Sequence, residues 1–296
     1  MQNLYKYSLI CFIFIAIGAK AQQNLGYQLK VGDTFQVRQQ AKQLITQKLE
    51  GTEHEMTNDL SGFLEFKVDS VTDTGYAMTM MFKDFGLTSS SSIQGTLMDV
   101  KASELVEGDI MSEMFHGLLN YELHLKMAKN GSIIAVEGGE GLINKMISAA
   151  GIEDEFTVKM MEKSLGKDFS SNGLAKSFEQ MTFFYPDGQV AIGDTWENTY
   201  EGKLSANNTF TLEKIENGTT SITGESAVTM DTNESGTIMS LSGAQEMLIE
   251  ATTTTGLLKK MMVSSKVEGF SKMAQMGDVE IPTTIDSTIT YEITQE

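Results

Sequence analysis

The stretch YPDGQVAIGDTWENTY, residues 185–200, contains Gly-Asp-Thr-Trp, and Gly-Asp-Thr-Phe stands at residues 32–35, near the start of the chain. Glycine adopts positive φ readily, and an aspartate side chain can bond its own backbone, so each copy predicts a tight turn that leads into a strand. The following aromatic residue, Phe35 or Trp196, is then expected to fill the core. A ligand contact by Trp196 is the alternative.

Alternating apolar residues predict strands on both sides of these turns. In FLEFKVDSV, residues 63–71, the even positions Leu64, Phe66 and Val68 are apolar, and the alternation resumes after the turn at residues 73–75. YELHLKMAKNGSIIAVEG, residues 121–138, has the same pattern around Asn130-Gly131, which is a strong hairpin signal. The last strand, residues 281–293, has isoleucine and tyrosine on one parity and polar residues on the other. These patterns are typical of antiparallel strands with one buried face.

The order of the motifs indicates an internal duplication. Each copy begins with the Gly-Asp-Thr turn, continues through hairpins and reaches Val-Glu-Gly, at residues 136–138 and 267–269. Between the copies, apolar residues take helical spacing from about residue 140 to 184, and a short helix is expected near residues 111–119. We therefore predict an α+β protein dominated by antiparallel strands. Two meander repeats, about 25–138 and 186–296, form one curved sheet or half-barrel, with the helical insert packed on one face.

The N-terminus predicts export. Lys6 precedes a short apolar run, and Ala19-Lys20-Ala21 matches an A-x-A cleavage site. Residues 1–21 are thus interpreted as a signal peptide cleaved after Ala21, and residues 22–296 as one compact domain in the periplasm or outside the cell. Cys11 lies inside the signal, so the mature chain would carry no cysteine and no disulfide.

Composition excludes several classes of partner. The mature chain would carry 20 basic and 40 acidic residues, a formal charge of −20. Nucleic-acid binding needs clustered cationic side chains, so no nucleic-acid partner is expected. No segment after the signal approaches the roughly 20 apolar residues of a membrane-spanning helix, so the mature chain is not expected to be an integral membrane protein. Protein partners stay open.

Taken together, LKVGDTF, NGSIIAVEG, the helical insert, YPDGQVAIGDTW, TTTTGLLKKMMVSSKVEG and IPTTIDSTITYEI resemble an uncharacterised family of secreted Bacteroidota proteins, a domain of unknown function. The resemblance covers nearly the whole mature chain. Its motifs are turn and strand-edge patterns. The resemblance implies an exported β-rich protein and supplies no catalytic residues.

No catalytic or metal motif emerges from the residues themselves. The three histidines are His54, His116 and His124. His54 lies in the charged run EGTEHEMTND, residues 50–59, which is interpreted as a solvated loop, and His124 lies on the polar parity of its strand. H-E-x-x-H and G-x-S-x-G are absent, and the serine run LTSSSSIQG, residues 87–95, is interpreted as a flexible connection. We expect no enzyme, no cofactor and no metal site.

Methionine is the unusual feature, at 20 residues. Met111, Met114 and His116 could offer soft ligands to copper, but core packing explains most methionines better. A third possibility is a methionine-lined cavity between the curved sheet and the helical insert, suited to an apolar, lipid-like ligand. The expected lining residues are Met78, Met80, Phe82, Met146, Phe156, Met160 and Phe178. The function favoured by the sequence is thus a non-enzymatic envelope or secreted binding module, and the alternative is a structural or protein-interaction component without a cavity.

Overall fold

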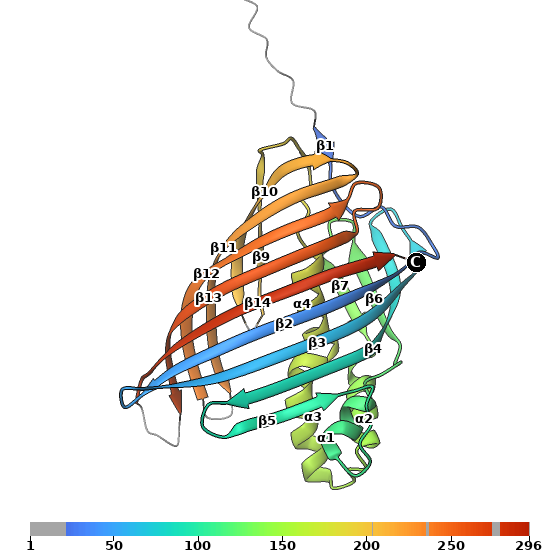
Figure 1. Cartoon of the computed structure of the whole chain (residues 1–296). Helices are drawn as coiled ribbons and strands as arrows, with labels where there is room; N and C mark the ends of the chain where they lie inside the picture. The colour runs from blue at the N-terminus through green and yellow to red at the C-terminus, as the bar shows by residue number, and fades with distance from the viewer. Residues whose placement is uncertain (1–21, 203, 235–236, 274–278, 296) are drawn as a thin grey trace, which may run out of the picture.

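The computed structural model describes residues 22–202, 204–234, 237–273 and 279–295. Most of these residues belong to one large, curved antiparallel sheet that does not close on itself, and helices lie against it (Figure 1). The predicted α+β class, with antiparallel strands that form one curved sheet and helices on one face, is confirmed. The predicted signal peptide and its cleavage site lie outside the described residues.

The described residues form fourteen strands and four helices. The strands are β1 Gln23–Asn24, β2 Thr34–Leu49, β3 Thr52–Val71, β4 Gly75–Ser91, β5 Gly95–Lys101, β6 Leu123–Ala128, β7 Ile133–Glu137, β8 Gln189–Val190, β9 Thr195–Tyr200, β10 Ser205–Glu216, β11 Thr219–Glu234, β12 Thr237–Thr252, β13 Leu258–Met273 and β14 Ile281–Gln295. The helices are α1 Ile110–His116, α2 Gly139–Ala149, α3 Glu155–Phe169 and α4 Ser171–Thr182. Helices α2 to α4 occupy the predicted insert.

The two halves of the chain share one sheet. Its order is β7-β6-β4-β3-β2-β14-β13-β12-β11-β10-β9, with β5 added to β4, while β1 and β8 form a separate pair. The first and last long strands, β2 and β14, pair antiparallel at the centre, from Phe35 opposite Gln295 to Gln47 opposite Thr283. In Figure 1 these are the blue and red strands that lie side by side. The halves are therefore joined by backbone hydrogen bonds.

Both copies of the Gly-Asp-Thr motif make the same turn. Gly32 and Gly193 have φ of 90° and 87°. The carboxylates of Asp33 and Asp194 each accept from the backbone N–H three residues earlier, at 2.8 and 2.9 Å. The N–H and C=O groups around each motif also bond equivalent positions of the next strand, β3 in the first copy and β10 in the second. The turn places each following strand against its neighbour in the same register.

The aromatic residue after each turn packs on the strand to which that turn is hydrogen-bonded, β3 in the first copy and β10 in the second. Phe35 stacks on Phe66 with ring centroids 5.0 Å apart, and Trp196 stacks on Phe210 at 5.9 Å. Phe35 is buried, whereas Trp196 is partly buried and donates its indole N–H to the Phe184 carbonyl at 3.0 Å. Both the indole N–H and the ring face of Trp196 thus contact other parts of the protein.

Alternation along the strands separates core from solvent. In β14 the predicted apolar parity is inward, since Ile281, Ile285 and Tyr291 are each at most 4% exposed. In the same strand Asp286 and Glu292 are exposed. One large core cluster joins residues of both halves to the helices, and a second, smaller cluster contains Ala206, Val228, Leu241, Val267 and Ile285.

The ends of the first long hairpins were misread from the sequence. Residues 52–59 and 87–91, interpreted as a solvated loop and a flexible connection, are strand residues of β3 and β4. Polar side chains line both faces there: Ser89 donates to Asn58 at 2.8 Å, and Asn58 donates to Gln43 at 3.0 Å. The period-two contrast of polar and apolar residues is lost in this part of the sheet, although the backbone pairing continues.

Helix α4 bridges the two open edges of the sheet. It packs against edge strand β7, and the β7 residue Ile133 donates its N–H to Glu179 at 3.2 Å. On the other side, Asn198 of edge strand β9 donates its amide to the Phe183 carbonyl, which follows α4, at 2.7 Å. The edges are thus connected through a helix and not through a strand pair. This leaves space between the helices and the concave sheet.

Candidate functional site

An apolar pocket of about 600 Å³ lies between the sheet and the helices. Strands β2 to β5 and β14 line one side, and α1, α3 and α4 line the other. From the strands come Leu60, Gly62, Leu64, Phe82, Phe85, Leu87 and Met98. From the helices come Met111, Met114, Phe115, Met161, Leu165, Phe169, Leu174, Phe178 and Met181. We call this site the apolar pocket.

Aromatic rings stiffen one wall of the apolar pocket. Phe85 and Phe115 are stacked with centroids 5.1 Å apart, which ties β4 to α1. Phe169, at the end of α3, packs edge-on against Phe82, Phe85 and Phe115 at 6.2 to 6.4 Å. Such edge-to-face pairs add about 0.5–1.5 kcal/mol each beyond the burial of area. The wall formed by these rings is therefore fixed, while the methionines offer adaptable contacts elsewhere.

Polar residues form the smaller part of the pocket lining. They are Gln39, Ser164, Asp168, Ser177, Gln180 and Tyr291. Gln39 donates to the Tyr291 hydroxyl at 3.5 Å, the long limit of a hydrogen bond. Burial raises the pKa of Tyr291 above its usual range, so this phenol stays neutral. The pocket can thus bind an apolar group and offers a small number of hydrogen-bonding side chains.

The structure brings only part of the predicted lining set to this pocket. Phe82 and Phe178 line it. Met78 lies, with Phe178, on a small cavity of about 20 Å³. Met80 and Met146 are fully buried in the core and line neither space.

Two further predicted lining residues lie at the surface. Phe156 and Met160 of α3 are 73% and 55% exposed and are not part of the pocket wall. The α3 side chains that do reach the pocket include Met161, Leu165 and Phe169, spaced four residues apart. That spacing is visible in the sequence, but Phe156 and Met160 have the same spacing, so the sequence alone does not select the face that lines the pocket.

The copper alternative finds no support in the arrangement of α1. Met111 and Met114 both line the apolar pocket, but His116 does not. The His116 Nδ1 lies 2.9 Å from the Ala102 carbonyl oxygen, at the distance of a hydrogen bond between a side chain and the backbone. Within the described part of the chain, no three His, Cys, Asp or Glu side chains form a group that could hold a metal ion.

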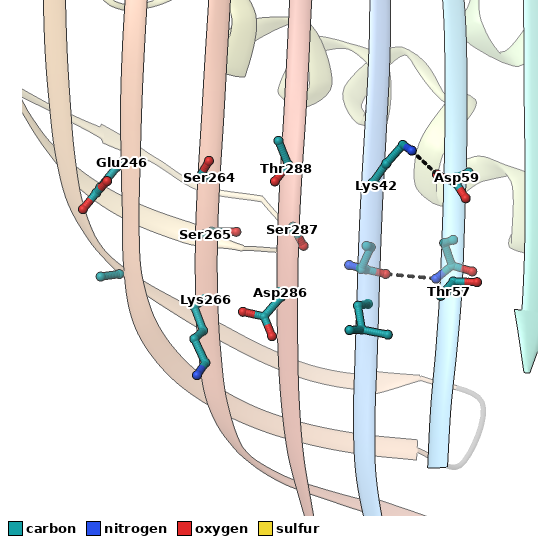
Figure 2. A pocket seen from close by; sticks show the side chains of 14 residues that line it. Lys42, Thr57, Asp59, Glu246, Ser264, Ser265, Lys266, Asp286, Ser287 and Thr288 are labelled. Carbon is teal, nitrogen blue, oxygen red and sulfur yellow. Dashed lines mark hydrogen bonds and ion pairs between the residues drawn. The ribbon is translucent and has the colours of Figure 1, made fainter. Parts of the chain in front are cut away.

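A second hollow of about 590 Å³ lies along the central strands (Figure 2). Hydroxyl, amide and charged side chains of β2, β3 and β12 to β14 line it, among them Ser264, Lys266 and Asp286. Its Lys42–Asp59 pair is 3.9 Å apart, with 80% and 55% of the side chains exposed. Exposed pairs of this kind contribute little, typically about 0–1 kcal/mol. The hollow lacks the apolar enclosure of the first pocket and is a weaker ligand site.

The profile of a family of unknown function, DUF6263, matches residues 73–258, more than half of the chain. The chain belongs to this family. The matched region contains all four helices together with β4 and β5. For this DUF6263 member, the helical wall of the apolar pocket therefore lies inside the family region, whereas β2 and β14 lie outside it.

Comparison with other proteins adds distant similarities of fold. No curated protein matches this family member. The structure "Lipid-protein interactions in lipovitellin" is similar with a TM-score of 0.48 and 11% identity, over 90% of this chain and 25% of that one. An outer membrane channel from Pseudomonas putida F1 gives 0.37 and 9%, over 90% and 97%. The DUF6263 chain thus spans a quarter of the lipovitellin chain. Among the described residues, no helix combines the length and hydropathy needed to cross a membrane.

Proposed function

We propose that this protein is an exported, non-enzymatic binding module of the cell envelope or of the secreted fraction, and that it holds an apolar, lipid-like ligand in the apolar pocket. The observation that carries the proposal is the pocket of about 600 Å³ between sheet and helices. Small-molecule sites typically measure about 300–1,000 Å³ and are lined mainly by apolar side chains.

The composition of the pocket wall supports this class of ligand. Five methionines, Met98, Met111, Met114, Met161 and Met181, lie among leucine and phenylalanine. Methionine is unbranched and polarizable, so it can adjust to ligand shapes that are not fixed in advance. A structural component without a cavity is the rival function, and a lined pocket of this size favours binding.

The proposed export of the protein is based on its N-terminal sequence. Residues 1–21 have the features of a signal peptide, and the resemblance to secreted Bacteroidota proteins points the same way. Cell fractionation and N-terminal sequencing test this part: export with a mature chain that starts at Gln22 is expected. Retention in the cytoplasm with Met1 intact would contradict it.

The binding experiment fills the pocket from its sheet side. Gly62 lines the pocket, and a Cβ built there would make only ordinary contacts, the nearest atom being Gln39 Oε1 at 3.5 Å. Gly62→Leu is therefore expected to fold and to place its side chain into the pocket. Delipidated wild type should bind a fluorescent fatty acid probe, and Gly62→Leu should weaken that binding at least about tenfold, because the space is occupied.

Ser61→Leu is the matched control, since Ser61 is adjacent in β3 and exposed on the opposite face. It should bind the probe as wild type does. Native mass spectrometry of protein purified without delipidation should detect a bound apolar molecule in the wild type. Failure of the wild type to carry or bind any such molecule would leave the structural role. Activity in a screen of ester, peptide and glycoside substrates would overturn the non-enzymatic part.

A further inference from the structure

A polar cavity of about 510 Å³ adjoins the apolar pocket at the junction of α3 and α4. The two share three lining residues, Asp168, Ser177 and Gln180. Its other lining residues include Gly202, in the β9–β10 connection, and Asn233 of β11. We call it the polar cavity. A ligand that leaves the apolar pocket past Gln180 would enter it directly.

Gln180 lines both the apolar pocket and the polar cavity. It also lines a narrow cavity of about 40 Å³ beneath α4, where Tyr200 and Tyr291 lie. Gln180 is partly buried, so its side chain can be reached from the cavities that it lines. An amide that is partly removed from water offers one acceptor and two donors to a bound molecule.

The lining of the polar cavity has balanced charge. The charged lining residues are two lysines, Lys167 and Lys176, and two aspartates, Asp168 and Asp231. The remaining polar groups are amides and hydroxyls: Ser170, Asn172, Ser177, Gln180, Tyr200, Thr232 and Asn233. Burial, with a smaller effect of the Glu179 charge, raises the pKa of Tyr200 to about 12, so its phenol is neutral. Such a lining favours an uncharged or zwitterionic group over one with a large net charge.

We propose that the ligand is an amphiphile whose apolar chain lies in the apolar pocket and whose uncharged or zwitterionic head lies in the polar cavity, with a hydrogen bond to Gln180. This inference rests on the proposed lipid-binding function and adds the chemistry of the head group. The juxtaposition of an apolar and a polar space of similar size, which share Gln180, carries it.

Competitors that share a dodecyl chain isolate the contribution of the head. Dodecanol, monolauroyl glycerol, dodecylphosphocholine, dodecanoate and dodecyltrimethylammonium are each used, below their micellar concentrations, to displace the fluorescent fatty acid probe. Monolauroyl glycerol and dodecylphosphocholine should bind about five- to tenfold more tightly than dodecanol, since one or two net hydrogen bonds correspond to that factor. Dodecanoate and dodecyltrimethylammonium should lack this advantage.

Gln180→Leu tests the named contact. It should remove most of the preference for monolauroyl glycerol over dodecanol while leaving dodecanol affinity within about twofold. Gln40→Leu, on the exposed parity of β2, is the matched control and should keep the wild-type preference. Ser177→Ala provides a second variant at the boundary, and thermal unfolding of each variant confirms that it is folded.

The outcomes separate the two proposals. If all five competitors bind equally and Gln180→Leu changes nothing, the head-group inference is overturned while lipid binding stands. A preference for one net charge would also overturn it. If neither probe nor competitor binds, the proposed function itself fails.

Discussion

At the scale of single residues, Asp33 and Asp194 fix the two turns that start the two halves. Each carboxylate accepts a backbone N–H three residues earlier, and each aspartate N–H donates back to the same residue's carbonyl. Since a neutral hydrogen bond contributes about 0.5–1.5 kcal/mol net and one to a charged group more, each turn depends measurably on its aspartate. The sequence motif alone predicted this role.

Asp194→Ala should therefore lower the free energy of unfolding by about 1–2 kcal/mol, measured by urea denaturation. Asp194→Asn keeps an acceptor oxygen and should recover at least half of the loss. Asp33→Ala should behave like Asp194→Ala because the geometry is the same. Equal stabilities for Asp194→Ala and wild type would show that the backbone holds the turn without the side chain.

Residue-scale prediction was weakest at the pocket wall. Period-two alternation fixes which strand residues face inward, and Phe82 of β4 lines the apolar pocket. In α3, by contrast, two apolar stripes compete, Phe156 with Met160 and Met161 with Leu165. Only the packing of α3 against α2 and α4 decides that the second stripe faces the pocket. Helical spacing identifies apolar stripes on a helix, but it does not show which of two stripes faces the pocket.

At the scale of elements, the helical insert was predicted well in extent because its apolar residues change from period two to helical spacing. How its helices are held together was not predictable, since the contacts join residues far apart in sequence. Glu140, in the first turn of α2, accepts from the Ser171 hydroxyl at 2.6 Å and from the Ser171 N–H at 3.2 Å. It therefore ties the start of α2 to the start of α4.

This contact predicts a pH dependence. The hydrogen bond from the Ser171 hydroxyl, with backbone N–H bonds, lowers the pKa of Glu140 in the folded protein. A lowered folded pKa means that the stabilisation is complete above the unfolded pKa, about 4.3, and is lost as pH falls through the folded value. Glu140→Gln should thus lower Tm slightly at pH 7, by about 2 °C, since Glu140 is exposed.

The Tm difference between wild type and Glu140→Gln should shrink as pH falls below about 4, measured by differential scanning calorimetry. Glu153→Gln, at an exposed position of the loop before α3, is the control and should track the wild type at every pH. A difference that stays constant down to pH 2.5 would mean that the Glu140 charge does not contribute.

At the scale of the whole molecule, the curved sheet was predictable because turn signals and alternation are local. The open form of the sheet was not predictable from the sequence. Close approach of the backbones of β12 and β13 permits the curvature: a Cβ at Gly243 would lie only 1.9 Å from the Lys266 carbonyl oxygen, and one at Gly269 2.2 Å from that of Ser240. Helix α4 then joins β7 to β9 in place of further strands. These are contacts between distant segments, and no local pattern encodes them.

Pairing of β2 with β14 predicts that the two halves unfold as one unit. Ile285 of β14 is 4% exposed in the smaller core cluster, so Ile285→Ala should cost about 2–4 kcal/mol. Because β14 hydrogen-bonds to both β13 and β2, hydrogen exchange should accelerate by a similar factor in peptides from β3 and β4 and in peptides from β10 and β11. Asp286→Ala, the exposed neighbour, should leave both sets unchanged.

Fluorescence of Trp196, the only tryptophan, should follow the same transition as far-ultraviolet circular dichroism. Faster exchange confined to β10 and β11 would mean that the sheet consists of two independently unfolding halves, and the pocket wall formed by β2 to β5 would then persist without β14.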